Sequence, residues 1–124
     1  MSPLRKISII TPSFNSLAYL KRCCASVADQ QGAIVEHIVV DGASTDGPVD
    51  WLKSSPGMRF ISESDQGMYE AVNKGLKMAG GEILAYLNCD EQYLPGALSA
   101  VTEWFERHPH VDIAFGHTIL IRPD

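Results

Sequence analysis

The chain has 124 residues, a length that suits one domain with a hydrophobic core of its own. Its composition, 45% hydrophobic and 20% charged, is that of an ordinary globular protein. The net charge of −5 argues against binding to nucleic acid or to an anionic membrane surface, since either would need a basic patch. No apolar run approaches the ~20 residues of a membrane-spanning helix, and we expect no signal peptide because the first apolar run is short.

The three cysteines are Cys23, Cys24 and Cys89. Their odd number argues against a disulfide framework, and no C-x-x-C spacing is present for zinc. Cys23 and Cys24 fall within a helical pattern, where free cysteine behaves as a small buried hydrophobe, so we expect both to pack in the core. This cysteine usage favours a reducing, cytoplasmic location.

Strand and helix signals alternate through the first half of the chain. Short β-branched runs predict strands, and apolar residues at helical spacing predict helices. The predicted elements of this half are a strand over residues 7–10 closed by Thr11 and Pro12, a helix over 17–27 capped by Asn15 or Ser16, a strand over 38–40 and a short helix over 49–53.

The second half repeats the alternation and contains the most regular amphipathic pattern of the chain. Its apolar positions recur at helical spacing from Met68 to Ala79, and two glycines follow, as they do at helix ends. The predicted elements of this half are a strand over residues 59–62, a helix over 68–79, a strand over 83–87, a helix from Pro95 to near Pro109, and strand-like runs over 113–115 and 118–121.

Strands that alternate with helices of ~10–15 residues indicate βαβ units and a mainly parallel sheet. Helices then cover both faces of the sheet, so we predict an α/β fold, a three-layer α/β/α sandwich. The chain stops directly after a strand-like run, and we therefore expect residues 1–124 to be one domain of a longer protein.

Polar clusters follow four of the predicted strands, at residues 11–15, 41–46, 63–66 and 88–91. In a parallel sheet all four emerge at one edge, where ligands bind in open α/β folds. Any single aspartate of this kind is most often a turn or helix-cap residue. Three loops that each bring a carboxylate to the same edge are less easily explained that way, and a divalent cation is one physical reason to gather them.

The last of these clusters, Asn88–Glu91, follows the apolar run Ile83–Leu87. A strand that ends abruptly in amide and carboxylate oxygens suits a hard cation such as Mg²⁺ or Mn²⁺, which often shares its ligands with a phosphate. The residues alone therefore predict a metal–nucleotide site at this edge.

Four ordered motifs resemble the N-terminal half of glycosyltransferase family 2: Thr11–Asn15, Val39–Gly47, Ser64–Gly75 and Gly81–Glu91. The resemblance covers almost the whole chain, in the order and spacing of that family. It implies the GT-A fold and an inverting transfer of a sugar from a nucleotide-diphospho-sugar. It also implies that residues 1–124 are a single nucleotide-sugar-binding domain, the N-terminal part of a longer glycosyltransferase.

For the first two motifs the resemblance implies contacts with the nucleotide. Thr11, Pro12 and Asn15 would line the nucleotide pocket at the end of the first strand. Asp41 would accept a hydrogen bond from the base, and Ser44 would shape the loop that carries it.

For the later motifs the resemblance implies contacts with the sugar and the metal. Asp65 would lie near the sugar or the ribose. Asn88 and Asp90 occupy the ends of the family's D-x-D motif, so Asp90 would bind Mn²⁺ or Mg²⁺ through its carboxylate while Asn88 assists at the nucleotide-sugar. Asn88 departs from the family pattern because an amide oxygen offers less charge than a carboxylate. Glu91 would either add a ligand or cap the next helix.

The resemblance also implies which parts of the chemistry this chain would supply. Asp90 and its metal would stabilise the diphosphate leaving group, and the strand-end loops would orient the sugar. The family's catalytic base is an acidic residue of the C-terminal half, so no base is assigned within this chain. Its titratable histidines are interpreted as surface or loop residues: His108, His110 and His117.

The implied partners are a UDP-, GDP- or dTDP-sugar donor and a saccharide or glycolipid acceptor. Members of the family build polysaccharides, lipopolysaccharide and glycolipids of the cell envelope, often at the inner face of a membrane. The resemblance therefore implies a cytoplasmic protein that works peripherally at that face.

Three other functions are weighed against this one. A receiver-like signalling domain would need a hydroxyl residue and a lysine at the ends of its late strands, where this chain has Asn88 and His117. A dinucleotide-binding oxidoreductase would need G-x-G-x-x-G after the first strand, where this chain has Thr11–Asn15. A non-catalytic nucleotide-binding or oligomerising domain would keep the fold, and an uncovered last strand could pair edge to edge in a homodimer.

Overall fold

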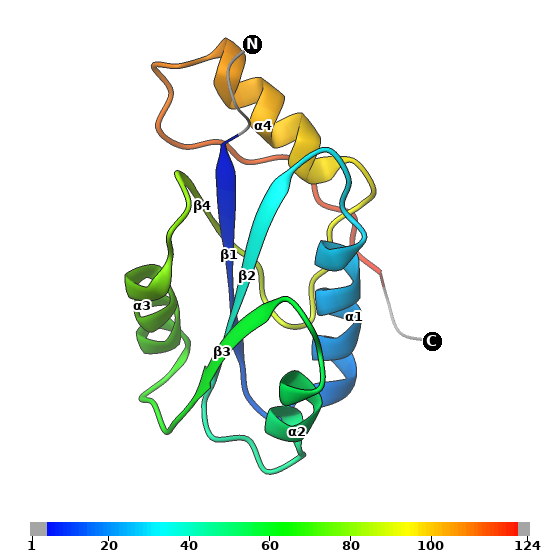
Figure 1. Cartoon of the computed structure of the whole chain (residues 1–124), viewed down its shortest axis with the longest axis vertical. Coiled ribbons are helices and arrows are strands. Elements are labelled where there is room, and N and C mark those ends of the chain that lie inside the picture. The colour runs from blue at the N-terminus through cyan, green and yellow to red at the C-terminus, as the bar shows by residue number, and fades with distance from the viewer. Residues whose placement is uncertain (1–4, 122–124) are drawn as a thin grey trace.

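The computed structural model describes residues 5–121 and is built around one parallel sheet (Figure 1). No helix within this range is long and apolar enough to cross a membrane. The elements in chain order are β1 (Lys6–Ser13), α1 (Leu17–Ala28), β2 (Ile34–Asp41), α2 (Pro48–Lys53), β3 (Met58–Ser62), α3 (Met68–Met78), β4 (Ile83–Tyr86) and α4 (Ala97–Arg107).

The four strands lie in the order β3-β2-β1-β4, and every neighbouring pair is parallel. All strands therefore end at the same edge of the sheet, which confirms the predicted parallel arrangement. The register places Ser13 of β1 opposite Asp41 of β2, and Asp41 opposite Ser62 of β3. The last residues of three strands thus form one row at the carboxyl edge.

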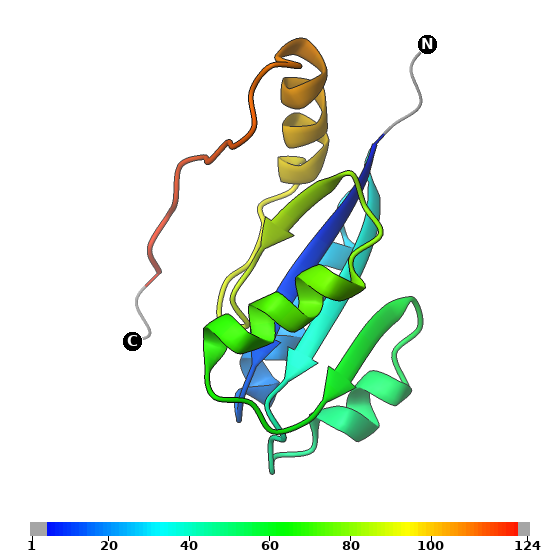
Figure 2. The same cartoon turned by 90° about the vertical axis from the view of Figure 1, so that its left-hand side faces the viewer.

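Helices cover both faces of the sheet, as predicted for a three-layer sandwich. Figure 2 shows α3 in front of the sheet and α1 and α2 behind it. On the α1 face, Leu98 of α4 packs with Ile7 and Ile9 of β1, and Leu20 of α1 packs with Val39 of β2. On the opposite face Ala71 of α3 packs against β2. Cys23 and Cys24 are buried free thiols in this packing, as expected.

β1 continues beyond the predicted strand, so Thr11 and Pro12 lie within it rather than closing it. A proline is tolerated in this central strand because of its position. The carbonyl of Ile10 accepts from Leu87 just past the end of β4, so the residue two positions later also faces that side. There β4 has already ended, and the missing N–H of Pro12 breaks no pairing.

The C-terminal part of the described chain differs from the prediction. α4 begins at Ala97, two residues after Pro95, and residues 108–121 form neither strand nor helix, so the strand-like runs predicted there are wrong. Figure 2 shows this segment running clear of the sheet, with Phe115 98% exposed. A β-branched pattern makes a strand only when an edge pairs with it. His117 accordingly follows exposed extended chain and not a core strand.

Glu36 of β2 anchors the opposite, amino-terminal end of the sheet. Its side chain is 9% exposed, and its carboxylate accepts hydrogen bonds from Ser8 (2.6 Å), the Gly80 amide (2.9 Å) and Arg59 (2.6 Å). The hydrogen bond from Ser8, followed by those from Gly80 and Arg59, lowers the pKa of Glu36 to about 2. This cluster ties β1, β2 and β3 to the chain that leaves α3.

α3 lies very close to the sheet at Gly75. A Cβ on this residue would come within 2.4 Å of Cγ2 and 3.2 Å of Cβ of Ile10. The close approach allows only glycine here, although glycine is a poor helix former.

We expect Gly75→Ala to destabilise the fold by about 1–3 kcal/mol. The gain in helix propensity, about 1 kcal/mol, is outweighed by overpacking against Ile10. Urea unfolding at neutral pH measures the difference. Lys77→Ala, an exposed site of the same helix, is the control and should change stability little. A Gly75→Ala protein as stable as the wild type would show that α3 can move away at no cost.

Glu36→Gln should lower stability in a pH-dependent way. The pKa of Glu36 is depressed in the folded state from 4.5 to about 2, so its contribution is complete above pH 4.5 and is lost as the pH falls toward 2. The variant should lose on the order of 2–3 kcal/mol at pH 7 and almost nothing at pH 2. Denaturant curves of both proteins between pH 2 and 7 measure this gap. A gap that stays constant with pH would contradict the assignment.

Candidate functional site

Asp41 ends β2 at the carboxyl edge of the sheet and is fully buried. Its Oδ1 accepts from the Ser44 hydroxyl, and its Oδ2 accepts from the Ser44 amide (2.9 Å) and the Ser62 hydroxyl (2.7 Å). A buried carboxylate is costly unless such donors satisfy it. Asp41 therefore fixes the start of the β2–α2 loop and joins that loop to the end of β3.

The β1–α1 and β2–α2 loops are bonded directly to each other. The amide of Asn15 donates to the Ser44 hydroxyl (2.8 Å), and Oδ1 of Asn15 accepts from the Thr45 amide (2.8 Å). Asn15 and Ala43 both have positive φ, 47° and 63°. Asparagine tolerates this conformation, whereas alanine is strained in it, so the loop around Ala43 is held in shape by its surroundings.

Asp46 acts on the helix that follows the first loop. The N-cap residue of α1, Ser16, makes no side-chain capping bond, and the amide of Leu17 instead donates to Oδ2 of Asp46 (2.9 Å). A carboxylate at this end of a helix also interacts favourably with the helix dipole. The second loop thus supplies the cap that the first loop lacks.

Thr11 is fully buried and faces the α1 side of the sheet. Its hydroxyl lies 2.8 Å from Nε2 of His37, whose pKa is lowered to about 4 by burial. His37 is therefore neutral at physiological pH. Its Nδ1 and the Oγ of Ser13 are buried without a hydrogen-bond partner among the described residues.

The β3–α3 loop brings Asp65 over the backbone of the β2–α2 loop. A Cβ on Gly42 would lie 3.1 Å from Oδ2 of Asp65 and 3.4 Å from the ring of Phe14. Asp65 is thereby placed beside the start of the β2–α2 loop, with Oδ1 accepting from the Gly67 amide (3.1 Å). The exposed ring of Phe14 and the carboxylate of Asp65 thus flank the backbone of Gly42, which has no side chain.

In the loop between β4 and α4, the side chain of Asp90 is exposed to solvent. Asn88 is half-buried, and its amide oxygen accepts from the Tyr86 hydroxyl. That oxygen is thus already engaged, whereas no donor among the described residues bonds to the carboxylate of Asp90. The amide of Glu91 donates to the carbonyl of Asn88 (3.0 Å), which closes a turn around Asp90.

The donor set for a metal at this edge is small. Within residues 5–121, no three histidine, cysteine, aspartate or glutamate side chains converge as a metal cage. One exposed carboxylate fits a cation that takes most of its oxygens from a diphosphate and water, as Mg²⁺ does at nucleotides. Asp90 suits such a shared site, and the amide oxygen of Asn88, which accepts from Tyr86, has one further lone pair with which it could assist.

The structure thus brings the predicted site residues to one edge but at different depths. Thr11, Pro12 and Asp41 are buried, Ser44, Asp65 and Asn88 are half-buried, and Asn15 and Asp90 are exposed. The sequence assigned no role to Ser62 or His37. In the structure Ser62 is hydrogen-bonded to Asp41, and His37 is hydrogen-bonded to Thr11. The signal for Ser62 was its place at the end of a strand, but its partner depends on the register between strands.

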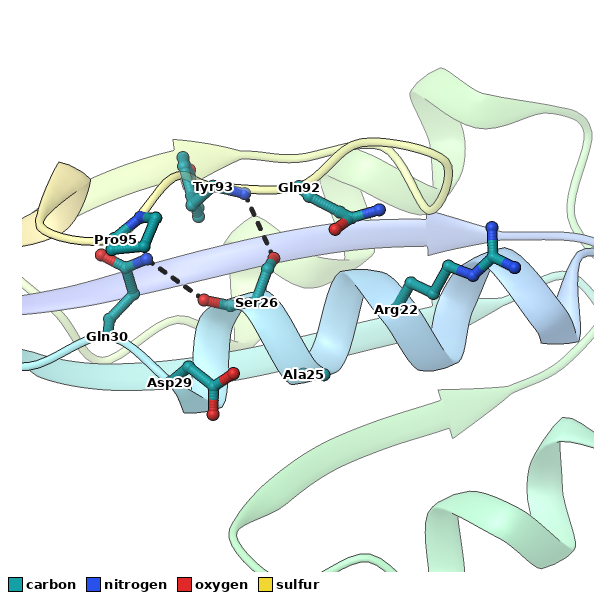
Figure 3. Close-up of a pocket in the computed structure, with 8 residues that line it drawn as sticks. All are labelled: Arg22, Ala25, Ser26, Asp29, Gln30, Gln92, Tyr93 and Pro95. Atoms are coloured by element: carbon teal, nitrogen blue, oxygen red, sulfur yellow. Dashed lines mark hydrogen bonds between the residues drawn. The ribbon is translucent and has the colours of Figure 1, made fainter. Parts of the chain in front are cut away.

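Two pockets open elsewhere on the surface. One, of about 290 Å³, lies between α1 and the loop after β4 and is drawn in Figure 3. The other, of about 530 Å³, is lined by α1, α2, β2 and the residues that lead into β3. The residues predicted for the site, which lie along the strand-end rim, line neither of these two pockets.

A parallel α/β sheet with polar loops gathered at its carboxyl edge is common to open α/β folds that bind ligands there. Residues 8–121 match the model of the family described as glycosyl transferase family 2. The chain therefore belongs to glycosyl transferase family 2.

Three similar proteins illustrate the relationship. A PGL/p-HBAD biosynthesis glycosyltransferase of Mycobacterium tuberculosis is 34% identical over 119 residues, which cover 91% of this chain and 46% of that protein. TarS of S. aureus, solved in complex with UDP-GlcNAc, is 25% identical with a TM-score of 0.75, over 84% of this chain and 32% of that one. A mannosyltransferase of Pyrobaculum calidifontis, solved with GDP-Man and Mn²⁺, is 24% identical with a TM-score of 0.73, over 84% and 33%. The chain spans about half the length of the curated relative.

We expect Asp46→Ala to destabilise the protein by about 0.5–2 kcal/mol, because the first turn of α1 loses its cap. Thermal or urea unfolding measures the loss. Asp112→Ala, which removes an equal charge from an exposed residue outside any helix or strand, is the control and should have little effect. Equal stabilities of the two variants would mean that the bond from Leu17 to Asp46 contributes nothing.

Proposed function

We propose that this chain is the donor-binding part of a metal-dependent, inverting glycosyltransferase. Its substrate would be a nucleotide-diphospho-sugar. The observation that carries the proposal is the direct bonding of Asn15 to Ser44 and Thr45, which joins two strand-end loops beside Asp65. Ligands of parallel α/β sheets bind at this edge. A joined, pre-shaped loop pair lowers the entropic cost of holding a flexible donor.

Asp90 is the residue proposed to hold the cation, Mn²⁺ or Mg²⁺. When bound, the cation would neutralise charge that develops on the departing diphosphate. Asp90 suits this role because its carboxylate is exposed and, among the described residues, receives no hydrogen bond. Glu91 follows it directly and is also exposed. Its predicted helix-cap role is wrong, because α4 begins only at Ala97 with Gly96 as its N-cap, whereas its role as a metal ligand stays a prediction.

Nucleotide contacts are proposed for the buried and half-buried residues of the same edge. Asp41 already accepts three hydrogen bonds from Ser44 and Ser62, so Oδ1 has one acceptor site left for a base N–H, which would have to reach a fully buried carboxylate. Asn15 and Ser44 lie nearer the surface of the joined loops. Asp65, which lies beside the backbone of Gly42, is proposed to contact the ribose or the sugar.

The donor and the acceptor are proposed by class. TarS was solved with UDP-GlcNAc and the Pyrobaculum mannosyltransferase with GDP-Man, which supports a nucleotide-diphospho-sugar donor and leaves UDP-, GDP- and dTDP-sugars as candidates. The mycobacterial relative is named for PGL/p-HBAD biosynthesis. For this chain we propose a saccharide or glycolipid acceptor. We also propose that the protein works peripherally at the cytoplasmic face of a membrane.

Calorimetric titration with UDP, GDP and dTDP tests the proposal, each with and without Mn²⁺. We expect at least one nucleotide to bind, with an affinity that Mn²⁺ raises about tenfold or more, and Asp90→Ala to abolish only the gain from the metal.

Asp112→Ala is the control, because it removes an exposed carboxylate that lies outside the strand-end loops and should keep that gain. If no nucleotide binds and Asp90→Ala changes nothing, the proposal fails. Light scattering would then test the alternative of a non-catalytic domain that oligomerises.

A further inference from the structure

The loop between β4 and α4, residues 87–96, is fastened to α1 by two side chains. The hydroxyl of Ser26 accepts from the Tyr93 amide (3.1 Å) and donates to the carbonyl of Cys23 (2.7 Å). Nε2 of Gln30 donates to the carbonyl of Leu94 (2.9 Å) and to the carbonyl of Ser26 (3.2 Å). Figure 3 shows Ser26 and Gln30 directed from the α1 side toward Tyr93 and Pro95.

Gln30 also caps α4 from a distance of 68 residues along the chain. The N-cap residue of α4 is Gly96, which has no side chain to offer, and the Leu98 amide donates to Oε1 of Gln30 (3.0 Å). One amide side chain therefore donates to the loop and accepts from the helix that follows it. Both of its functional atoms are used.

These contacts fix the loop on both sides of Asp90. Before it, Leu87 is buried in the core, and its amide donates to the carbonyl of Ile10 (3.0 Å). After it, Tyr93 is held by Ser26 and packs partly against the same core. Asp90 lies three residues from each of these points, and its own carboxylate is held by no donor of the described chain. Its position is thus set by the ends of the loop.

We propose that Ser26 and Gln30 are positioning residues for Asp90, a role that rests on the proposed function of this site. Neither residue lies at the carboxyl edge. They act through the backbone of the loop. Without their hydrogen bonds the Asp90 carboxylate would still be present but would sample more positions. A cation shared between Asp90 and a diphosphate requires the carboxylate in one position. The gain in nucleotide affinity from the metal therefore depends on the bonds of Ser26 to Tyr93 and of Gln30 to Leu94, which we call the clasp.

Gln30→Glu separates the two tasks of Gln30. A carboxylate still accepts from the Leu98 amide and suits the start of a helix, so α4 keeps its cap. The atom that donated to the Leu94 carbonyl becomes an acceptor, so the loop is repelled. Gln31→Glu, the same change at the exposed neighbouring residue, is the matched control.

Amide hydrogen exchange tests the clasp without any ligand. We expect Gln30→Glu to raise exchange at Tyr93 several-fold while exchange in α4 stays near that of the wild type, and Gln31→Glu to change neither. Ser26→Ala should give the same local loss. If Gln30→Glu and Ser26→Ala both leave Tyr93 as protected as Gln31→Glu does, the clasp is overturned, whatever the nucleotide titrations show.

Titration of the same variants tests the link to Asp90. We expect Gln30→Glu to lower the gain in nucleotide affinity from Mn²⁺ by about fivefold or more, with the metal-free affinity and the melting temperature nearly unchanged. A purely structural role of Gln30 would lower the melting temperature and leave that gain intact, which would overturn the inference. A wild type without any metal gain would instead overturn the metal part of the proposed function, and with it the positioning role, even where the exchange result supports the clasp.

Discussion

The carboxylate of Asp41 is the interaction around which the candidate site is organised. It is a charge fully withdrawn from water, and such a charge persists only with several donors. Ser44 supplies two of them, and its hydroxyl in turn accepts from the amide of Asn15. One buried charge at the end of β2 thereby determines the shape of its own loop and, through Ser44, the position of the loop after β1. Ser62 extends the same order to the end of β3.

Two helices of the α1 face depend on caps from other parts of the chain. Asp46 of the β2–α2 loop caps α1, and Gln30, just after α1, caps α4. The first bond connects the β2–α2 loop to the start of α1, and the second connects Gln30 to α4. The same Gln30 side chain also bonds to Leu94 in the loop of Asp90. α1 is therefore the rigid connection between the two halves of the rim. This arrangement explains how short polar loops with little packing of their own hold a common geometry.

The sequence was sufficient for the fold because each strand carries its own signal, an apolar run followed by a polar loop. It also placed the polar clusters on one edge, since parallel strands must end together. It could not identify the partners of Asp41 or Gln30, which depend on strand register and on contacts 21 and 68 residues apart in the chain. It was wrong about residues 113–121 because strand propensity does not show whether an edge is there to pair. Local sequence patterns thus predicted the helices and strands, whereas contacts between distant parts of the chain determine how the site residues are bonded.

The carboxylates near the two ends of β2 differ in whether a cationic side chain pairs with them. At the amino end, Glu36 is matched by Arg59 and Lys6 and is a stabilising ion cluster. At the carboxyl edge, Lys74 pairs with Glu63 and Glu70, and within the described residues no cation is bonded to Asp65 or Asp90. Unpaired carboxylates on one rim repel each other and cost stability, so they are a burden on the fold unless a cation or a ligand uses them.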